Sequence, residues 1–253
     1  MRHSTTFLMS LIVASILVLM FLNLVLGSVS IPLKSVWNII CGLGDEPVTW
    51  QNIVWKSRLP QALTALVAGA GLAISGLQMQ TVFRNPLAGP SVLGISSGAS
   101  MGVAFVVLLS GSLGGVALSK LGFMGEIALS IAAVIGSLSV MALIVYVSQK
   151  VKGNVTLLII GVMIGYVANA VIGVLKFFSV EEDIRAYVIW GLGSFSRVSG
   201  NQMMLFVAIM AILIPLSFLL IKTLNLMLLG DGYARNLGLN IKRARLLVIT
   251  SAG

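Results

Sequence analysis

Charged residues are scarce in this chain. Only 9% of its 253 residues are Asp, Glu, Lys or Arg, whereas 58% are hydrophobic, and the mean hydropathy is +1.08. A soluble domain needs far more polar surface than this to cover its core. The composition therefore excludes a soluble globular fold and predicts an all-α membrane protein.

Residues that usually carry chemistry are also few. The chain has one cysteine, Cys41, and one histidine, His3, so it has no intrachain disulfide, no cysteine-based metal cage and no Ser–His pair at membrane depth. It contains no GxxxxGK[ST] phosphate loop and no embedded series of acids and bases such as proton-coupled carriers use. We expect no catalytic residue, no metal and no cofactor.

The net charge of +9 does not indicate nucleic-acid binding, because the basic residues lie scattered at the ends of apolar runs without interleaved aromatics. Such flanking Lys and Arg are typical topology signals. If the N-terminus is cytoplasmic, the inner segments are the shorter ones and are denser in positive charge, which favours this orientation. Six of the seven acids then lie outside, and Asp231 is the exception.

Six stretches without Asp, Glu, Lys or Arg are each long enough for the roughly 20 residues that cross a bilayer core. They lie between Arg2 and Lys34, Arg58 and Arg84, Arg84 and Lys120, Glu126 and Lys150, Lys152 and Lys176, and Arg197 and Lys222. We predict a multi-span bundle of six complete transmembrane helices, of which the second covers about 61–82, the third about 91–110 and the sixth about 203–221. The first run, 7–26, exceeds the roughly 7–15 apolar residues of a signal peptide, so it is read as a retained helix.

Small residues recur every four positions within these runs. Four residues make about one helical turn, so each row forms a strip along which a second helix packs almost backbone to backbone in lipid. The packing rows contain Gly69 between Ala65 and Ala73, Gly94, Gly98 and Gly102, Gly136 after Ala128 and Ala132, and Gly161, Gly165, Asn169 and Gly173. Asn169, the one strongly polar member of the longest row, either bonds a neighbouring helix or faces a wet pathway.

Three segments between the spans have patterns of their own. In residues 27–57, Val36, Trp37 and Ile40 are expected on one face of a short helix, within a loop that rests on the bilayer surface. The glycine-rich segment after Lys176 is expected to hold short surface helices. Residues 229–245 predict two short helices, one ending at Gly238 and the next capped by Asn240. This pair is a docking surface for another protein, or alternatively a basic segment that touches anionic lipid.

Several short motifs occur in a fixed order along the chain. They are Arg58-Leu-Pro60, Ala68-Gly-Ala70, Ser75-Gly76, Gln80, Arg84-Asn-Pro-Leu-Ala88, Leu93-Gly-Ile-Ser-Ser-Gly98 and Ala234-Arg-Asn-Leu-Gly238. In this order and spacing they resemble the FecCD-type permeases of binding-protein-dependent ABC importers, which take up iron–siderophore complexes, heme or cobalamin. The RNPLA and LGxSSG motifs together are specific, and the resemblance extends over essentially the whole chain.

The resemblance implies a single transmembrane permease domain over residues 1–253 in the bacterial cytoplasmic membrane. It implies a homodimer that encloses the path, a cytoplasmic ABC ATPase dimer below it, and a periplasmic or surface-anchored binding protein above it. Coupling helices at 229–245 would seat in a groove of the ATPase, through Asp231, Tyr233, Ala234, Arg235, Leu237 and Gly238. Arg58, helped by Lys56, would meet acids of the binding protein, since Gln61 stands where many members carry a second arginine. Lys152, Gly153, Asn154 and Thr156 match the region of the cytoplasmic gate.

A large metal chelate needs a wide path lined by small, mildly polar side chains. The candidates are Ser96, Ser97, Ser100 and Asn169, with helix-to-helix hydrogen bonding as the alternative role. The family usually has ten spans, whereas this sequence ends at Gly253 as a seventh begins, so we expect either a fragment or a truncated product without transport competence. Two competing interpretations are a stand-alone secondary carrier, and a membrane scaffold or intramembrane enzyme that transports nothing.

Overall fold

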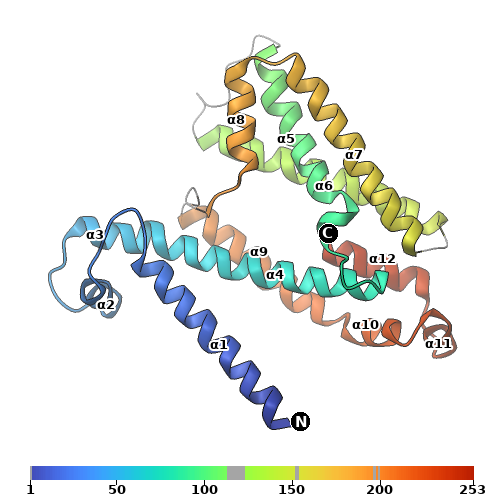
Figure 1. The fold of residues 1–253 in the computed structure, drawn as a ribbon, viewed down its shortest axis with the longest axis horizontal. Helices are drawn as coiled ribbons and strands as arrows, with labels where there is room; N and C mark the ends of the chain where they lie inside the picture. Colours follow the sequence, from blue (N-terminus) through green and yellow to red (C-terminus); the bar gives the residue numbers. More distant parts are fainter. Residues whose placement is uncertain (1, 113–122, 152–153, 196–197, 199) are drawn as a thin grey trace. The chain divides into compact units, whose positions relative to one another are not determined.

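The computed structural model of the chain describes residues 2–112, 123–151, 154–195, 198 and 200–253 (Figure 1). These residues form helices and connecting turns and contain no strand, which confirms the all-α prediction. In lipid every backbone N–H and C=O must be bonded within the protein, and a helix does this within one segment. The α-helices are α1 (Arg2–Val25), α2 (Leu33–Cys41), α3 (Val48–Ile53), α4 (Leu59–Phe83), α5 (Ile95–Ser112), α6 (Phe123–Lys150), α7 (Asn154–Phe177), α8 (Glu181–Gly191), α9 (Gly200–Phe218), α10 (Ile221–Leu228), α11 (Asp231–Asn236) and α12 (Ile241–Ala252).

Five helical stretches among the described residues are long and apolar enough to cross a membrane. They are Thr5–Val25, Val48–Phe83, Met124–Lys150, Val155–Phe177 and Gly200–Phe218. The expected third span, 91–110, is instead a shorter apolar helix over Ile95–Leu109. Its first residues form a separate 3₁₀ turn, Pro90–Leu93, and Gly94 then adopts a left-handed φ of 74° that breaks the helix. Among the described residues, five of the six predicted spans are thus found at full length, and the third is represented by α5.

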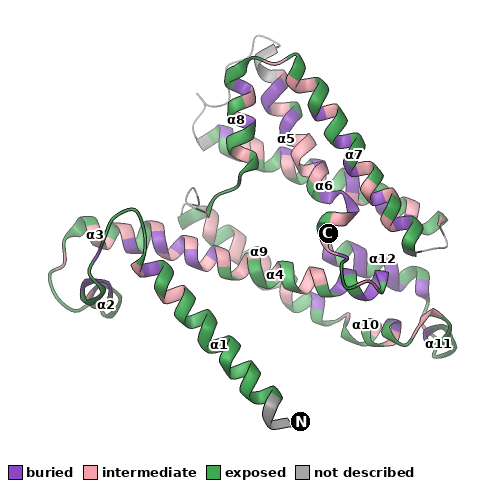
Figure 2. Ribbon diagram, viewed as in Figure 1, coloured by how far each residue is buried: buried purple, intermediate pink, exposed green. Residues whose placement is uncertain are grey.

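The chain divides into two compact units, which are described separately. Unit 1 comprises Met1–Gly71 with Ser194–Ile212, and unit 2 comprises Leu72–Gly193 with Leu213–Gly253. Two of the three boundaries fall inside α4 and α9, and the third falls between α8 and α9. In unit 1, α1 is exposed along most of its length (Figure 2).

The short helix α2 packs against unit 1 through Val36, which is fully buried, and Ile39. Trp37 and Ile40, which lie within about 100° of Val36 around the helix, are 55% and 37% exposed. The buried side of α2 is thus centred on Val36 and Ile39 rather than on Val36, Trp37 and Ile40. Neighbouring residues on a helix point about 100° apart, so burial of Val36 turns Trp37 outward.

In unit 2, α5 and α6 touch backbone to backbone. A methyl group built on Gly102 would lie 2.2 Å from the carbonyl oxygen of Ala132, and one on Gly136 would lie 2.2 Å from that of Gly98. Gly161, on α7, approaches Leu93 in the same manner. A side chain larger than hydrogen does not fit at such distances, so these glycines set the helix spacing.

Other members of the predicted rows have no packing role in the structure. Gly69 and Gly173 are exposed, and nothing lies within 4 Å of a methyl group built on either of them. Repeating small residues thus identify helix contacts on α5, α6 and the first half of α7. They do not do so on α4.

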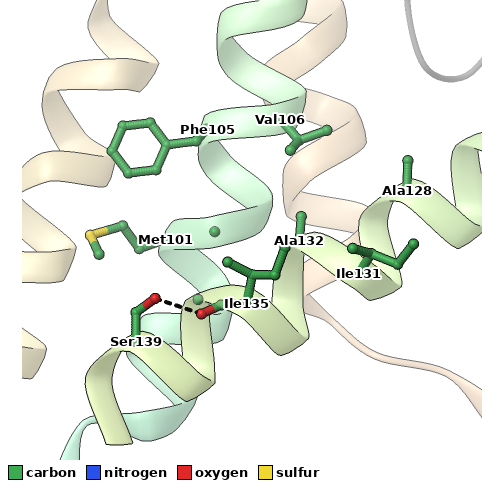
Figure 3. Close-up of a pocket in the computed structure, with 10 residues that line it drawn as sticks. Met101, Phe105, Val106, Ala128, Ile131, Ala132, Ile135 and Ser139 are labelled. Carbon is green, nitrogen blue, oxygen red and sulfur yellow. Dashed lines mark hydrogen bonds between the residues drawn. The ribbon is translucent and has the colours of Figure 1, made fainter. Parts of the chain in front are cut away.

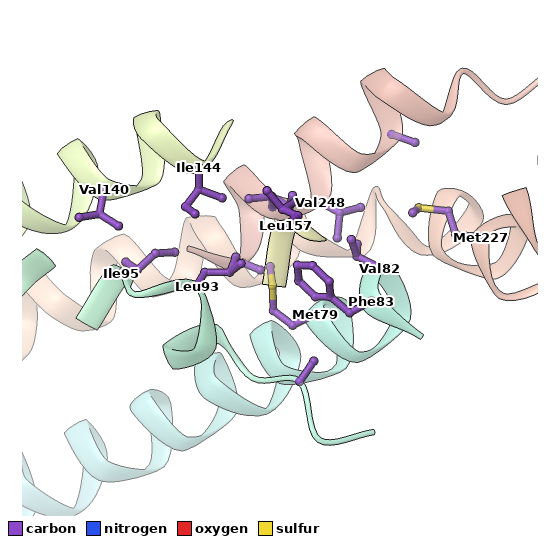
Figure 4. Close-up of a cluster of buried hydrophobic side chains, with 14 residues drawn as sticks. Met79, Val82, Phe83, Leu93, Ile95, Val140, Ile144, Leu157, Met227 and Val248 are labelled. Carbon is purple, nitrogen blue, oxygen red and sulfur yellow. The ribbon is translucent and has the colours of Figure 1, made fainter. Parts of the chain in front are cut away.

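A cluster of buried apolar side chains lies where the ends of several unit 2 helices meet (Figure 4). Its members are Met79, Val82, Phe83, Ala88, Leu93, Ile95, Val140, Ile144, Leu157, Met227, Ala244, Val248, Ile249 and Ala252. They come from the ends of α4 and α6, the starts of α5 and α7, and from α10 and α12. An end meets a start when successive helices run in opposite directions, so unit 2 has the alternating course that a multi-span chain requires.

Helix α8 covers the other end of α5. Tyr187 packs there in a second buried cluster with Val107, Leu108 and Ile172. The expected short helix after Lys176 is therefore present, and its first turn carries Glu181, Glu182 and Asp183, which suits the positive end of the helix dipole.

Candidate functional site

The last turns of unit 2 form the candidate site. Helix α10 ends at Leu228, α11 covers Asp231–Asn236, and Gly238, with a φ of 87°, ends it before α12 begins. The side chain of Asn240 accepts a hydrogen bond from the backbone N–H of Arg243 at 3.1 Å, the predicted cap. The second helix does not stop near residue 245 but continues to Ala252 as one helix.

Helix α11 has one buried and one exposed side. Ala234 is fully buried, whereas Tyr233 is 69% and Leu237 58% exposed. Arg235 is exposed as well. This surface combines apolar and cationic groups, and α11 packs against α10 and α12, which contribute Met227 and Ala244 to the buried cluster of Figure 4. A short helix with a rigid back and an amphipathic front is suited to binding another protein.

Two arginines from distant parts of the sequence converge on Asp231 at the start of α11. The guanidinium of Arg84 donates to one carboxylate oxygen at 2.6 Å, and that of Arg245 donates to the other at 3.5 Å. Arg84 also donates to the carbonyl of Met227 at 3.4 Å. The side chain of Arg245 is only 9% exposed, so Asp231 supplies a counter-charge that this buried cation needs.

The turns that end α4 and α11 have the same backbone geometry. After α11, the N–H of Leu239 bonds the carbonyl of Ala234 at 2.9 Å across Gly238. After α4, the N–H of Asn85 bonds the carbonyl of Gln80 at 3.2 Å across Arg84, whose φ is 48°. This six-residue closure normally has glycine at its left-handed position. Arginine there costs roughly 1–2 kcal/mol of backbone energy.

The structure gives Arg58 a different role from binding-protein docking. It is 4% exposed, and its guanidinium donates to the carbonyl oxygens of Leu24 at 2.8 Å, of Val25 at 2.7 Å and of Val29. These carbonyls include the last ones of α1, which have no partner within the helix. The arginine lies in a π-helical turn, Val54–Arg58, at the head of α4. Lys56, the other docking candidate, is exposed.

The predicted gate region is described only in part. Lys152 and Gly153 lie outside the described residues, Asn154 begins α7, and Thr156 is exposed.

The path-lining candidates separate into two pairs. Ser97 lies in the contact between α5 and α7, with its hydroxyl 3.3 Å from a methyl group built on Gly165. Ser100 hydrogen-bonds Tyr187 of α8, and this bond opposes the rise that burial causes in the pKa of Tyr187. These two serines therefore lie in contacts between helices, which is the alternative role. Ser96 and Asn169 are exposed.

An apolar pocket of about 520 Å³ opens between α5 and α6 (Figure 3). Met101, Phe105 and Ile131 are among its lining residues, and none of the four path candidates is. Ser139 contributes the only lining hydroxyl, which donates to the carbonyl of Ile135 at 2.7 Å. Apart from this hydroxyl and the thioether of Met101 the pocket is lined by apolar groups, and no cluster of three or more His, Cys, Asp or Glu side chains occurs among the described residues.

Sequence reasoning did not predict the roles of Arg84 and Arg245. A signal was present, because Asp231 is the only acid after Asp183 and is surrounded by basic residues in the sequence. A lone carboxylate in a basic segment at a membrane edge indicates a specific ion pair. The partner 147 positions away becomes evident only once the turn after α4 and the start of α11 are placed together.

Comparisons with known proteins agree with this architecture. The vitamin B12 import system permease protein BtuC of Serratia proteamaculans is 36% identical over 204 residues, which are 80% of this chain and 58% of that protein. The hemin transport system permease protein HmuU of Yersinia pestis is 34% identical over 230 residues, 90% of this chain and 65% of that protein. The chain thus spans about three fifths of the length of these relatives.

A solved structure assigned to the metal-chelate type of ABC transporter, in an inward-facing conformation, has the same fold. Its TM-score is 0.75 at 26% identity, over 94% of this chain and 69% of that one. Five long apolar helices and the permease relatives define a multi-pass membrane protein. The model of the FecCD transport family matches residues 15–253, and the chain belongs to that family.

Proposed function

We propose that this chain is a membrane-spanning permease subunit of an ABC importer that moves a metal chelate of the heme, cobalamin or iron–siderophore class across the cytoplasmic membrane. The observation that carries the proposal is the exposed front of α11, where Tyr233, Arg235 and Leu237 project beside a helix-ending Gly238. A separate ATPase dimer binds this surface. ATP binding and hydrolysis there shift the permease between outward and inward access.

The remaining partners follow the same proposal. The N-terminus and α11 are cytoplasmic, α8 and residues 27–57 face outward, and two copies of the permease enclose the path. Arg84 and Asp231 form an ion pair, so both residues lie on one side of the membrane. This requires an even number of membrane crossings between them, and the alternating helix directions in unit 2 support such an arrangement. On the outer side Lys56 is the exposed cation available to a binding protein. The relatives named for hemin and vitamin B12 support the chelate class.

Copurification tests the proposal. A tagged full chain expressed in its native cells is expected to bring down an ABC ATPase. Gly238→Ala is expected to weaken that association about tenfold, because a left-handed residue with a methyl group distorts the turn after α11. Gly232→Ala is the matched control, because Gly232 lies in α11 with an ordinary φ and open space around it. Absence of any ATPase from the wild-type preparation would refute the assignment.

A further inference from the structure

We propose that Arg84 is a positioning residue for the α11 surface: it ties the start of α11 to the end of α4, so that a displacement of α11 is passed to that membrane helix. The inference rests on the proposed function, because it concerns how the partner's motion enters the permease. It does not require Arg84 to touch the partner.

The backbone conformation of Arg84 is unfavourable for a residue with a side chain, which indicates that its guanidinium has a specific role. It is the one residue other than glycine with a positive φ in the part of the chain that the structure describes. The equivalent position after α11 is Gly238, which is spanned by the same kind of six-residue closing hydrogen bond. The turn after α4 would therefore form more easily with glycine, and the guanidinium contacts offset the unfavourable backbone.

Those contacts all lead to the hinge between α10 and α11. The guanidinium of Arg84 reaches Asp231 at 2.6 Å, in the first turn of α11, and the carbonyl of Met227 at 3.4 Å, near the end of α10. Gly230, which separates these two helices, has a φ of 108°. Arg84 thus bridges a glycine hinge from outside, which fixes the angle at which α11 leaves α10.

Arg245 makes the carboxylate of Asp231 hard to replace. The Nε of this buried arginine has no hydrogen-bond partner among the described residues, and its Nη2 is 3.5 Å from Asp231. No other acid follows Asp183 in the sequence. Asp231, on α11, therefore neutralises both Arg84, which follows α4, and Arg245, on α12. The three helices are thus joined at one carboxylate.

The end of α4 is able to transmit a displacement. Met79 and Val82 are fully buried in the cluster of Figure 4, and Phe83, beside Arg84, is 7% exposed. Tightly packed side chains move together rather than deforming. A pull on Asp231 is thus carried through Arg84 into the packed end of a helix that continues across the membrane.

Arg84→Gly separates this role from folding, because glycine suits the backbone while removing the guanidinium. Lys222→Gln, an exposed cation on α10, is the control for charge. Hydrogen exchange of the purified full chain is expected to become about 3- to 10-fold faster over residues 231–237 in Arg84→Gly and to stay unchanged in the control. Arg84→Lys should restore part of the protection. Unchanged exchange in Arg84→Gly would overturn the proposal.

The functional measurement uses proteoliposomes that contain the permease, its ATPase and its binding protein. Arg84→Gly is expected to retain ATP hydrolysis while chelate uptake per ATP falls about tenfold, and Arg84→Lys, which keeps a cation for Asp231, should recover part of it. Uptake per ATP equal to wild type in Arg84→Gly would overturn the positioning role. If the wild-type complex does not couple ATP to uptake, the proposed function fails. The hydrogen-exchange measurement then decides on its own whether Arg84 positions α11.

Discussion

At the scale of single residues, a buried arginine holds the end of the first membrane helix. The Arg58 guanidinium donates hydrogen bonds to the carbonyl oxygens of Leu24, Val25 and Val29. The arginine lies in the π-helical turn Val54–Arg58, which directs its side chain inward. From the sequence, a basic residue at a span end indicates an exposed docking or topology signal. Only the local backbone, which the sequence pattern does not specify, distinguishes that role from a helix cap.

Arg58→Ala is predicted to destabilise the protein by about 2–4 kcal/mol, because buried carbonyls lose charge-assisted hydrogen bonds. The measurement is thermal unfolding of the purified chain in detergent. Lys56→Ala, two residues away and exposed, should change stability by less than about 0.5 kcal/mol. Equal effects of the two variants would contradict the capping role.

Asp183 gives a prediction on pH. Burial, and next the charge of Glu182, raise the pKa of this carboxyl above the usual 3.8, and one of its oxygens has no hydrogen-bond partner among the described residues. The pKa of Asp183 is higher in the folded state than in the unfolded state. Protonated Asp183 therefore makes its full contribution to the free energy of unfolding below pH 3.8, and that contribution is lost as pH rises through the folded pKa. Asp183→Asn, which has no charge to bury, should be more stable than wild type at neutral pH and should show a flatter profile across that window.

The comparison is made by recording unfolding temperatures from acid to neutral pH. Glu181→Gln, at an exposed position in the same turn, serves as the control and should keep the slope of the wild type. A wild-type stability that rises steadily with pH over the window would show that the charge on Asp183 is not a cost to the fold.

At the scale of elements, close contact between α5 and α6 depends on glycine. Gly136→Ala is predicted to destabilise the protein by about 1–3 kcal/mol, because its methyl group would meet the backbone carbonyl of Gly98. Gly173→Ala is the matched control on α7 and should be neutral or stabilising by about 0.5–1 kcal/mol, since its surroundings are open. Unfolding in detergent reports both, and equal stability of the two variants would disprove the close contact.

The sequence predicts these elements well where lipid dictates the pattern. Long uncharged runs correspond to five of the spans, and the turn at Gly238 followed by the cap at Asn240 was readable from residue types alone. The prediction was wrong at the start of the third apolar run, where a membrane helix and a short turn are alternative structures for the same residues. Pro90 and Gly94 convert the first residues of the apolar run 91–110 into a separate turn, and that turn is selected by packing of Leu93 against Gly161.

The proposed coupling role of α11 comes from the family resemblance, whereas the ion pair between Arg84 and Asp231 that holds this helix was not predicted from the sequence. Arg84 and Asp231 are 147 residues apart, and nothing in periodicity or charge count pairs them. Their contact exists because the ends of α4, α6 and α10 collect around one apolar cluster. Long-range polar pairs of this kind follow from the assembled fold rather than from any local signal.

At the scale of the whole molecule, the proposed topology assigns each connecting segment to one side of the membrane. Cys41 is the only cysteine and is exposed, and it belongs to the proposed outer segment. A membrane-impermeant maleimide is predicted to label it in intact cells or spheroplasts. In a Cys41→Ser background, Gly232→Cys on α11 should react only after the membrane is opened. Labelling of position 232 in intact cells would place α11 outside and exclude contact with a cytoplasmic ATPase.

The central claim is that this permease moves a metal chelate with energy from a separate ATPase. The most direct test is uptake of heme and of cobalamin into proteoliposomes that hold the full-length permease with its ATPase and binding protein. We predict uptake that requires hydrolysable ATP and is indifferent to an imposed ion gradient. Uptake driven by an ion gradient without ATP would contradict the claim and would identify a secondary carrier instead.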